Sequence, residues 1–311
     1  MSVKIGKKHI LKGMPRLSAL PIFVVSFPLV MTCFSCRHRG HDDSPRLNLQ
    51  ITVKDKNYFN VDEVAQEERV AENLPFRSYI PTICYTLTDL ASGKVIYDSG
   101  VFEIIGNGSR VPVEIDDDDL PIGTYVLTVW GGLDDERPLD TDYRNIDFHQ
   151  QNAEGNDIYL TTDTIVYDSE NRFYLVEMER MKGKLIIKVE NLPEGYETSQ
   201  KRVTNLCDQA DYEFNYTGST MVKTEVTWRG SDVLTKTLLT PTVEDNVSVV
   251  RIQFLNEDEN APIISPDDVK VQISRNELTV LRYRWDEDAQ NFDIFIQVND
   301  LWHKYHELEI E

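Results

Sequence analysis

Few residues of this sequence have the types and spacing that catalysis requires. No GxSxG, HExxH or GxxxxGK motif occurs, and no CxxC pair follows residue 36. His303 and His306 are three residues apart, so on a strand their imidazoles point to opposite faces and do not share a metal. Asp116 to Asp119 could hold Ca²⁺, but an acidic hairpin turn is the simpler interpretation. We therefore predict a non-enzymatic protein with no metal, no other cofactor and no small-molecule substrate.

The tryptophans indicate a second kind of chemistry, the stacking of sugar rings on exposed aromatic faces. The sequence holds four of them, Trp130, Trp228, Trp285 and Trp302. The first three end an alternating strand, where a β-sandwich normally buries or half-buries an indole. Core packing is the preferred interpretation, and glycan binding at a cell surface is the alternative function. Asp163-Thr164-Ile165 resembles a short O-glycosylation acceptor, although an Asp-Thr pair at a strand edge explains it equally simply.

The strongest chemical signal is a thiol that follows an apolar run. Five basic residues and no acidic one occur in the first 35 residues, and residues 17–31 are almost wholly apolar. This order is the layout of a secretory signal. The run holds Pro21 and Pro28 and is shorter than the roughly 20 apolar residues that a membrane-spanning helix needs. A permanent transmembrane anchor is therefore the weaker interpretation.

Ser35-Cys36 resembles the end of a bacterial lipobox, in which a small residue precedes a cysteine that is acylated and becomes the mature N-terminus. Cys33 departs from the pattern, because an aliphatic residue is usual three positions before the acylated cysteine. Thr32-Cys33, with Val30 three residues earlier, is the competing site. We predict cleavage between Ser35 and Cys36 and a covalent lipid on Cys36, whose two acyl chains anchor a protein stably. An ordinary signal peptide is the alternative.

The charge of the remaining chain excludes one class of partner. Removal of residues 1–35 takes away five positive charges and changes the formal net charge from −21 to −26. Such a body repels phosphate backbones, so we expect no nucleic-acid binding. Cys84 and Cys207 stand between apolar residues, where the role of a buried small hydrophobe is preferred. A disulfide between them in an oxidising compartment is the alternative.

The elements that must carry these residues are predominantly strands. From Leu47 onward apolar and polar residues alternate, and Gly- or Pro-containing turns separate short segments at regular intervals. Residues 61–74 are the exception, because their apolar residues recur every three to four positions before Pro75, which predicts a helical insertion. The expected strands are 47–53, 83–87, 95–97, 111–115, 124–130, 157–166, 173–178, 185–189, 222–228, 247–254, 269–273, 278–285 and 292–298.

The pattern predicts an all-β protein with more than one core. No alternation of strands and helices occurs, which disfavours a parallel sheet and indicates a sandwich or barrel. The mature chain exceeds the usual size of a single core, so two domains are expected. The expected divisions are a signal peptide at 1–35, a polar tether at 36–46, a first sandwich at 47–178 and a second at 179–311.

The succession of these segments resembles the FimB-like fimbrial anchor lipoproteins of the Bacteroidetes, which are relatives of the fimbrillins. The resemblance rests on the lipoprotein signal, on GTYVLTVWGGL at 123–133, on YLVE at 174–177 with GKLIIKVENLP at 183–193, and on the strand at 292–298. It spans essentially the whole mature chain, but its motifs are strand patterns and not invariant catalytic residues. The family implies two tandem transthyretin-like β-sandwich domains and a surface-exposed protein that is held in the outer membrane by its lipid. It also implies a role in attaching a fimbrial polymer and limiting its length.

The resemblance further implies that subunits join by β-strand addition, in which an extended strand completes a neighbour's sheet. The candidate segment is the C-terminal one, whose alternate residues share a face: Trp302, Lys304, His306, Leu308 and Ile310. Leu308 and Ile310 would be its apolar plugs. The alternative is that this segment is simply the last strand of the second sandwich. The expected partners are other fimbrial subunits and, through the lipid, the outer membrane.

Overall fold

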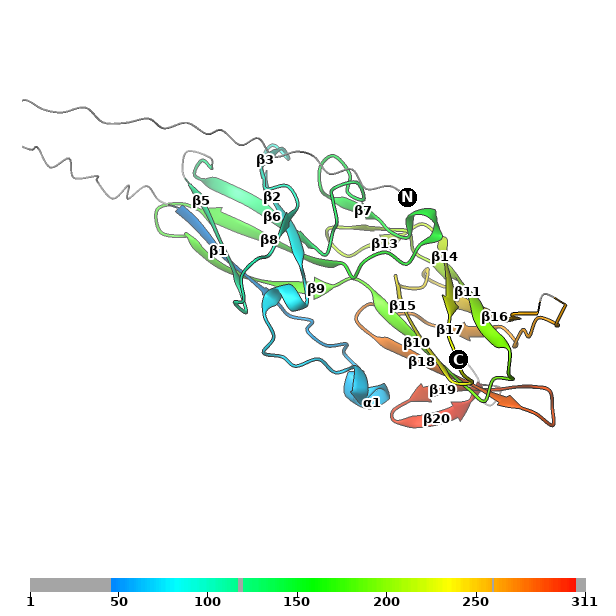
Figure 1. The fold of residues 1–311 in the computed structure, drawn as a ribbon. Helices are drawn as coiled ribbons and strands as arrows, with labels where there is room; N and C mark the ends of the chain where they lie inside the picture. The colour runs from blue at the N-terminus through cyan, green and yellow to red at the C-terminus, as the bar shows by residue number, and fades with distance from the viewer. Residues whose placement is uncertain (1–45, 117–119, 259, 306–311) are drawn as a thin grey trace, which may run out of the picture. The chain divides into compact units, whose positions relative to one another are not determined.

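The computed structural model describes residues 46–116, 120–258 and 260–305 (Figure 1). The described residues belong to one compact unit. Strands dominate this part of the chain, and its one α-helix is a single turn, α1 (Val61–Val64). The predicted all-β sandwich class is confirmed. Residues 1–45, which hold the expected signal and nearly all of the tether, lie outside the described residues.

The first half of the described chain forms one sheet of eight strands that folds into two layers. One layer holds β1 (Arg46–Val53), β5 (Val111–Asp116) and β9 (Phe173–Arg180). The other holds β2 (Thr82–Asp89), β3 (Val95–Asp98), β4 (Phe102–Glu103), β6 (Gly123–Gly131) and β8 (Tyr159–Tyr167). The layers are joined where β8 pairs with the end of β9. Alternate residues of β1, namely Leu47, Leu49 and Ile51, are fully buried between the layers.

The second half forms two separate sheets with a core between them. One sheet has the order β15 (Val233–Leu239), β10 (Gly183–Glu190), β18 (Leu278–Asp286), β19 (Asn291–Val298) and β20 (Leu301–Lys304). The other has the order β14 (Thr220–Thr227), β11 (Tyr196–Leu206), β16 (Ser248–Asn256) and β17 (Val269–Val271). Leu185 of β10 and Val203 of β11 meet in the shared core. This is the second sandwich of the predicted architecture.

A small third sheet connects the two halves. It pairs β7 (Asn145–Asp147) with β12 (Gln209–Asp211), which in turn pairs with β13 (Tyr216–Thr217). All other strand pairing among the described residues lies within 46–180 or within 183–304.

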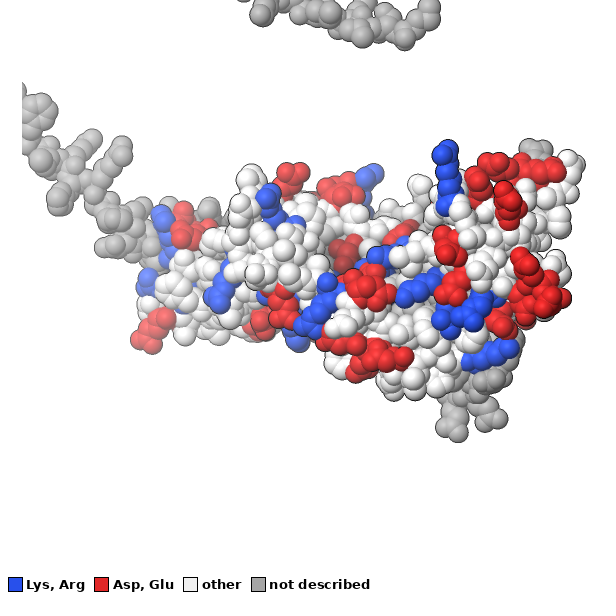
Figure 2. All heavy atoms as spheres, turned by 60° about the horizontal axis from the view of Figure 1, so that its bottom comes forward, with Lys and Arg blue, Asp and Glu red and all other residues white. Residues whose placement is uncertain are grey.

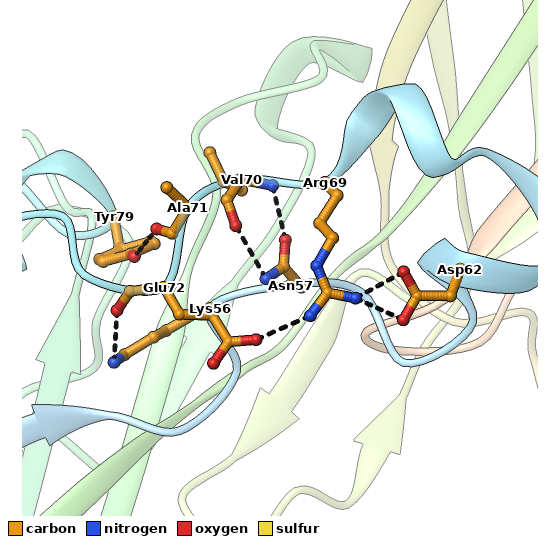
Figure 3. A network of polar contacts seen from close by, with 8 residues as sticks. All are labelled: Lys56, Asn57, Asp62, Arg69, Val70, Ala71, Glu72 and Tyr79. Carbon is orange, nitrogen blue, oxygen red and sulfur yellow. Dashed lines mark hydrogen bonds and ion pairs between the residues drawn. The ribbon is translucent and has the colours of Figure 1, made fainter.

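The helical insertion predicted between the first two strands is present as α1, but it covers only Val61–Val64 and not the whole of residues 61–74. After α1 the connection contains only the 3₁₀ turns η1 (Gln66–Glu68) and η2 (Phe76–Ser78). After η1 the backbone of residues 70–72 bonds to side chains instead of to a preceding helical turn (Figure 3). The Asn57 amide donates to the Val70 carbonyl at 3.1 Å and accepts from the Val70 N–H at 2.7 Å. Arg69 bonds both Asp62 and Glu72 in the same network.

Only the first apolar residues of the expected helix are buried on the second sandwich, since Ala71 is exposed and Leu74 is half-buried. Tyr58, Val61, Val64 and Ala65 pack against Ile186, Leu278 and Val280, on the face of the β10–β18 pair that is turned away from the core. Asn60 occupies the N-cap position of α1, but its side chain makes no capping bond. Its amide instead donates to the Leu278 carbonyl at 2.9 Å and accepts from the Leu278 N–H at 2.8 Å. The spacing of three to four residues therefore marks one turn of helix and a packing surface.

Candidate functional site

The C-terminal strand β20 lies at the edge of its sheet and is fixed in place by a tight hairpin. Val298 of β19 pairs with Leu301 of β20, so the turn between them has two residues. Those residues, Asn299 and Asp300, have φ of 46° and 61°. Asn and Asp tolerate this left-handed conformation, which matches the twist of a hairpin. The Asp300 N–H also donates to the Glu63 carbonyl at 2.6 Å, which ties the turn to α1.

Trp302 of β20 stacks with cations on the outer face of the sheet. The Arg282 guanidinium lies 4.2 Å from the centre of the Trp302 ring and 4.7 Å from that of Phe295. The ammonium of Lys188 lies 5.9 Å from the Trp302 ring on the same face. Trp302 is half-buried against the cluster formed by the β1–β2 connection. Contacts of this kind hold the strand to its own sheet.

Lys304 lies two residues beyond Trp302, on the same face. Its ammonium forms an ion pair with Asp293 of β19 at 2.8 Å. The alternation predicted for the C-terminal segment is thus present at Trp302 and Lys304, whereas His306, Leu308 and Ile310 lie outside the described residues. One edge of β20 pairs with β19, and no strand in the described part of the chain pairs with its other edge. An edge of this kind exposes the backbone groups to which a further strand can bind.

The lipidation site and the acidic turn cannot be located in the structure. Ser35, Cys36 and the competing Cys33 lie outside the described residues, as do residues 117–119 of the acidic turn after Asp116. Within the described ranges, no three His, Cys, Asp or Glu side chains gather as metal ligands. No helix within those ranges is long and apolar enough to cross a membrane.

Cys84 and Cys207 are both buried, and no disulfide joins them. Burial raises the pKa of the Cys84 thiol to about 12, and the pKa of Cys207 is raised for the same reason. The expectation that both act as small buried hydrophobes is confirmed.

The tryptophans serve mainly as core residues. Trp130 is fully buried and donates from Nε1 to the Tyr143 carbonyl at 2.9 Å. Trp285 is also buried, whereas Trp228 and Trp302 are half-buried and pack on their respective clusters. Sugar stacking on a row of exposed indoles therefore has no support. Thr164 of the glycosylation-like tripeptide is exposed in the middle of β8.

Sequence reasoning missed a buried polar hub at Arg180, the last residue of β9. Its Nε donates to Asp157 at 2.9 Å, its Nη1 donates to Asn276 at 2.9 Å, and its Nη2 donates to the Tyr159 hydroxyl. The guanidinium also lies 4.2 Å from the centre of the Tyr58 ring. Residues from four separate segments meet here. The sequence gives one sign of it, because MERMKG at 178–183 interrupts the alternation between the two predicted sandwiches.

A second missed feature is the buried base His149, which links residues 149–154 to the end of β15. Its Nδ1 lies 3.0 Å from the Ala153 carbonyl and 3.1 Å from that of Glu154. The Lys182 ammonium, also buried, donates to the Glu154 carbonyl at 2.8 Å. Burial lowers the pKa of Lys182 to about 8. This cluster has a structural role, because its polar groups form hydrogen bonds that join the two halves of the chain.

These tandem sandwiches define an all-β sandwich protein, and the same fold occurs in solved structures of Bacteroides proteins. No protein-family model matches the sequence, and no curated protein does. A candidate adhesin from Bacteroides thetaiotaomicron has a TM-score of 0.55 at 11% identity, over 84% of this chain and 98% of its own. A candidate polysaccharide-binding protein from the same organism has a TM-score of 0.54 at 11% identity, over 84% and 99%.

A fimbrial protein is also among the similar structures. The tip fimbrial protein Mfa3 from Porphyromonas gingivalis has a TM-score of 0.43 at 11% identity, over 81% of this chain and 99% of its own. At these identities the similarity establishes a shared fold.

Proposed function

We propose that this protein is a surface lipoprotein of the outer membrane that acts as an anchor or assembly subunit of a fimbria. The observation that carries the proposal is the fold, which is shared over nearly the whole length of a candidate adhesin. The lipoprotein signal and the strand motifs at 123–133, 174–177 and 183–193 favour the same class, the fimbrial anchor lipoproteins. No catalytic activity and no cofactor, apart from the lipid, belong to this function.

The proposed junction with other subunits is β-strand addition at the C-terminal segment. The edge of β20 supports this, because its outer side pairs with no described strand. In such a junction the main-chain hydrogen bonds supply strength, and alternate side chains set the register. Leu308 and Ile310 are the apolar side chains that would fill the neighbour's groove.

The polymer function is tested in the parent strain. Deletion of the gene should change the length of the filaments or their release into the medium, as measured by electron microscopy and by immunoblots of sheared material. Filaments that are indistinguishable between the parent and the deletion strain would refute the anchor role.

The junction is tested separately with two substitutions. Leu308→Asp with Ile310→Asp should prevent co-purification with sheared filaments, because charged side chains cannot fill an apolar groove. The matched control is Glu307→Gln with Glu309→Gln, at the alternate positions, which should leave co-purification unchanged. Equal behaviour of the two double variants would rule out this segment as the junction.

The lipid anchor has its own test. Cys36→Ala should release the protein from the membrane fraction, whereas Cys33→Ala should leave it there. The reverse outcome would place the acyl chains on Cys33.

A further inference from the structure

The outer face of the second sandwich carries a row of cations that the proposed function does not explain. It lies on the sheet β14–β11–β16 (Figure 1). Arg202 of β11 stands directly opposite Lys223 of β14 on one side and opposite Arg251 of β16 on the other. All three side chains are exposed. Neighbouring strands are about 4.8 Å apart, so the three positive charges form a continuous row across the strands.

This row is unfavourable for the isolated protein. Like charges directly opposite on neighbouring strands destabilise a sheet. Arg251 is neutralised by Asp268, with Nε and Nη2 at 2.9 and 2.5 Å from its carboxylate oxygens. Among the described residues, neither Arg202 nor Lys223 forms an ion pair. The chain has 53 acidic residues and 32 Lys and Arg, yet both cross-strand neighbours of Arg202 are cations.

The surroundings of the row are hydrophilic. The three cations line a hollow of about 480 Å³ whose other residues are also polar or charged. Gln200 and Gln253 lie opposite each other beside the row, and the Gln200 amide also donates to Glu225 at 2.9 Å. No apolar side chain lines the hollow. Protein partners usually bind through buried aromatic or apolar anchors, so this surface suits a hydrated ligand better than a protein.

The charge of the whole molecule does not prevent anion binding at this place. Acidic and basic side chains are interspersed on the face shown in Figure 2, and no single sign covers it. At physiological ionic strength the Debye length is about 8 Å, so a ligand in the hollow responds mainly to the charges that line it, in which the three cations outnumber the one carboxylate, Glu225.

We propose that the outer face of β14–β11–β16 binds an anionic polysaccharide. Its carboxylate or sulfate groups would lie over Lys223, Arg202 and Arg251. An arginine fork donates two parallel hydrogen bonds to such a group, and Gln200 and Gln253 supply amide groups for sugar hydroxyls. This site lies apart from β20 and does not depend on fimbrial assembly.

The test measures binding of the purified full chain to heparin and to polygalacturonate, with dextran as the neutral polymer. Binding to at least one polyanion should be detected by biolayer interferometry at 50 mM salt and should weaken steeply at 200 mM. The triple variant Arg202→Gln, Lys223→Gln, Arg251→Gln should bind about tenfold more weakly or worse. The control variant Arg77→Gln, Lys94→Gln, Arg137→Gln removes three exposed cations elsewhere and should bind within about twofold of wild type.

Equal losses in the two triple variants would show general charge attraction and overturn the proposal, as would the absence of binding to both polyanions. Poly-glutamate binding as tightly as the polysaccharides would assign the surface to acidic proteins instead. Because heparin carries both groups and polygalacturonate only carboxylates, tighter binding to heparin would show that sulfate groups add to binding, and tighter binding to polygalacturonate would show that carboxylates suffice. Thermal melts monitor folding, and the first triple variant should melt close to wild type, because the repulsion that it removes offsets the loss of the exposed Arg251–Asp268 ion pair.

Discussion

The backbone N–H of Thr240 donates a hydrogen bond to Nε2 of His149 at 3.1 Å, across 91 residues of sequence. This bond fixes the tautomer, because Nε2 must be unprotonated to accept and Nδ1 therefore carries the hydrogen that faces the carbonyls of Ala153 and Glu154. Every polar group of the ring is used. The imidazole thus joins the two halves of the chain in its neutral form only.

Acid should weaken the fold through His149. Burial, with the nearby positive charge of Lys182, lowers its pKa to about 4 from a usual value of about 6.5. Between these pH values His149 is protonated in the unfolded chain but not in the folded chain. Its contribution to the free energy of unfolding is therefore complete above pH 6.5 and is lost as the pH falls towards 4. The loss is at most about 3 kcal/mol.

Urea unfolding at a series of pH values measures this effect. His149→Gln should be less stable at pH 7 and should lose less stability than wild type between pH 6.5 and 4. His303→Gln is the matched control and should keep the wild-type slope. A wild-type slope in His149→Gln would show that other groups carry the acid sensitivity.

Lys201 should cost stability at neutral pH. Its buried ammonium donates only to the hydroxyls of Thr235 and Thr237, at 3.2 and 2.5 Å. Burial lowers its pKa to about 8, so the folded protein gains stability as the pH rises from 8 to 10.5, where only the unfolded chain holds the proton. Lys201→Met should raise the free energy of unfolding at pH 7 by about 1–3 kcal/mol.

The comparison is with Lys94→Met, which removes an exposed ammonium and should change stability by less than about 0.5 kcal/mol. The gain from Lys201→Met should shrink as the pH is raised to 10. A variant that is less stable than wild type at pH 7 would mean that the two threonine hydroxyls compensate the burial of the charge.

Strands with one apolar face could be predicted from the sequence, and those without one could not. β1 alternates Leu47, Leu49 and Ile51 with polar residues, and its predicted bounds agree with the structure. β11 was missed although it is the longest strand and central in its sheet. Its inward face carries Ser199 and Lys201, so polar residues occupy both faces and the period of two disappears.

The hydrogen-bonded clusters were hidden for a different reason. His149 acts through Thr240 and Arg180 through Asn276, and these partners are distant in sequence. Only the fold brings them together, because a lone polar residue carries no periodic signal. The cation row was missed likewise, since the register of β14, β11 and β16 decides which charges face each other.

Arg180 should be the most sensitive polar position of the described chain. Its guanidinium is buried and its charge is balanced by Asp157. Arg180→Met should cost about 3–5 kcal/mol, because it leaves that carboxylate without its cation and also removes the bond to Asn276. Adding Asp157→Asn should restore part of the loss, as measured by chemical unfolding. Strict additivity of the two substitutions would show that the pair is not coupled.

Two asparagines offer a matched test of what holds the β1–β2 connection. Asn60 and Asn57 each form two hydrogen bonds to the backbone of one residue, Asn60 to Leu278 and Asn57 to Val70. The Asn60 bonds are partly buried and join separate elements, whereas those of Asn57 are exposed and lie within the connection.

Asn60→Ala should therefore lower the free energy of unfolding by about 2 kcal/mol, since it leaves a partly buried N–H and carbonyl of β18 unpaired. Asn57→Ala should cost less than about 1 kcal/mol, because water can replace its bonds. Hydrogen exchange separates the two roles further: Asn60→Ala should speed exchange at the Leu278 amide, and Asn57→Ala at the Val70 amide. If both variants lose the same stability, the connection is held by its apolar contacts, and the exchange rate at Leu278 should then be unchanged.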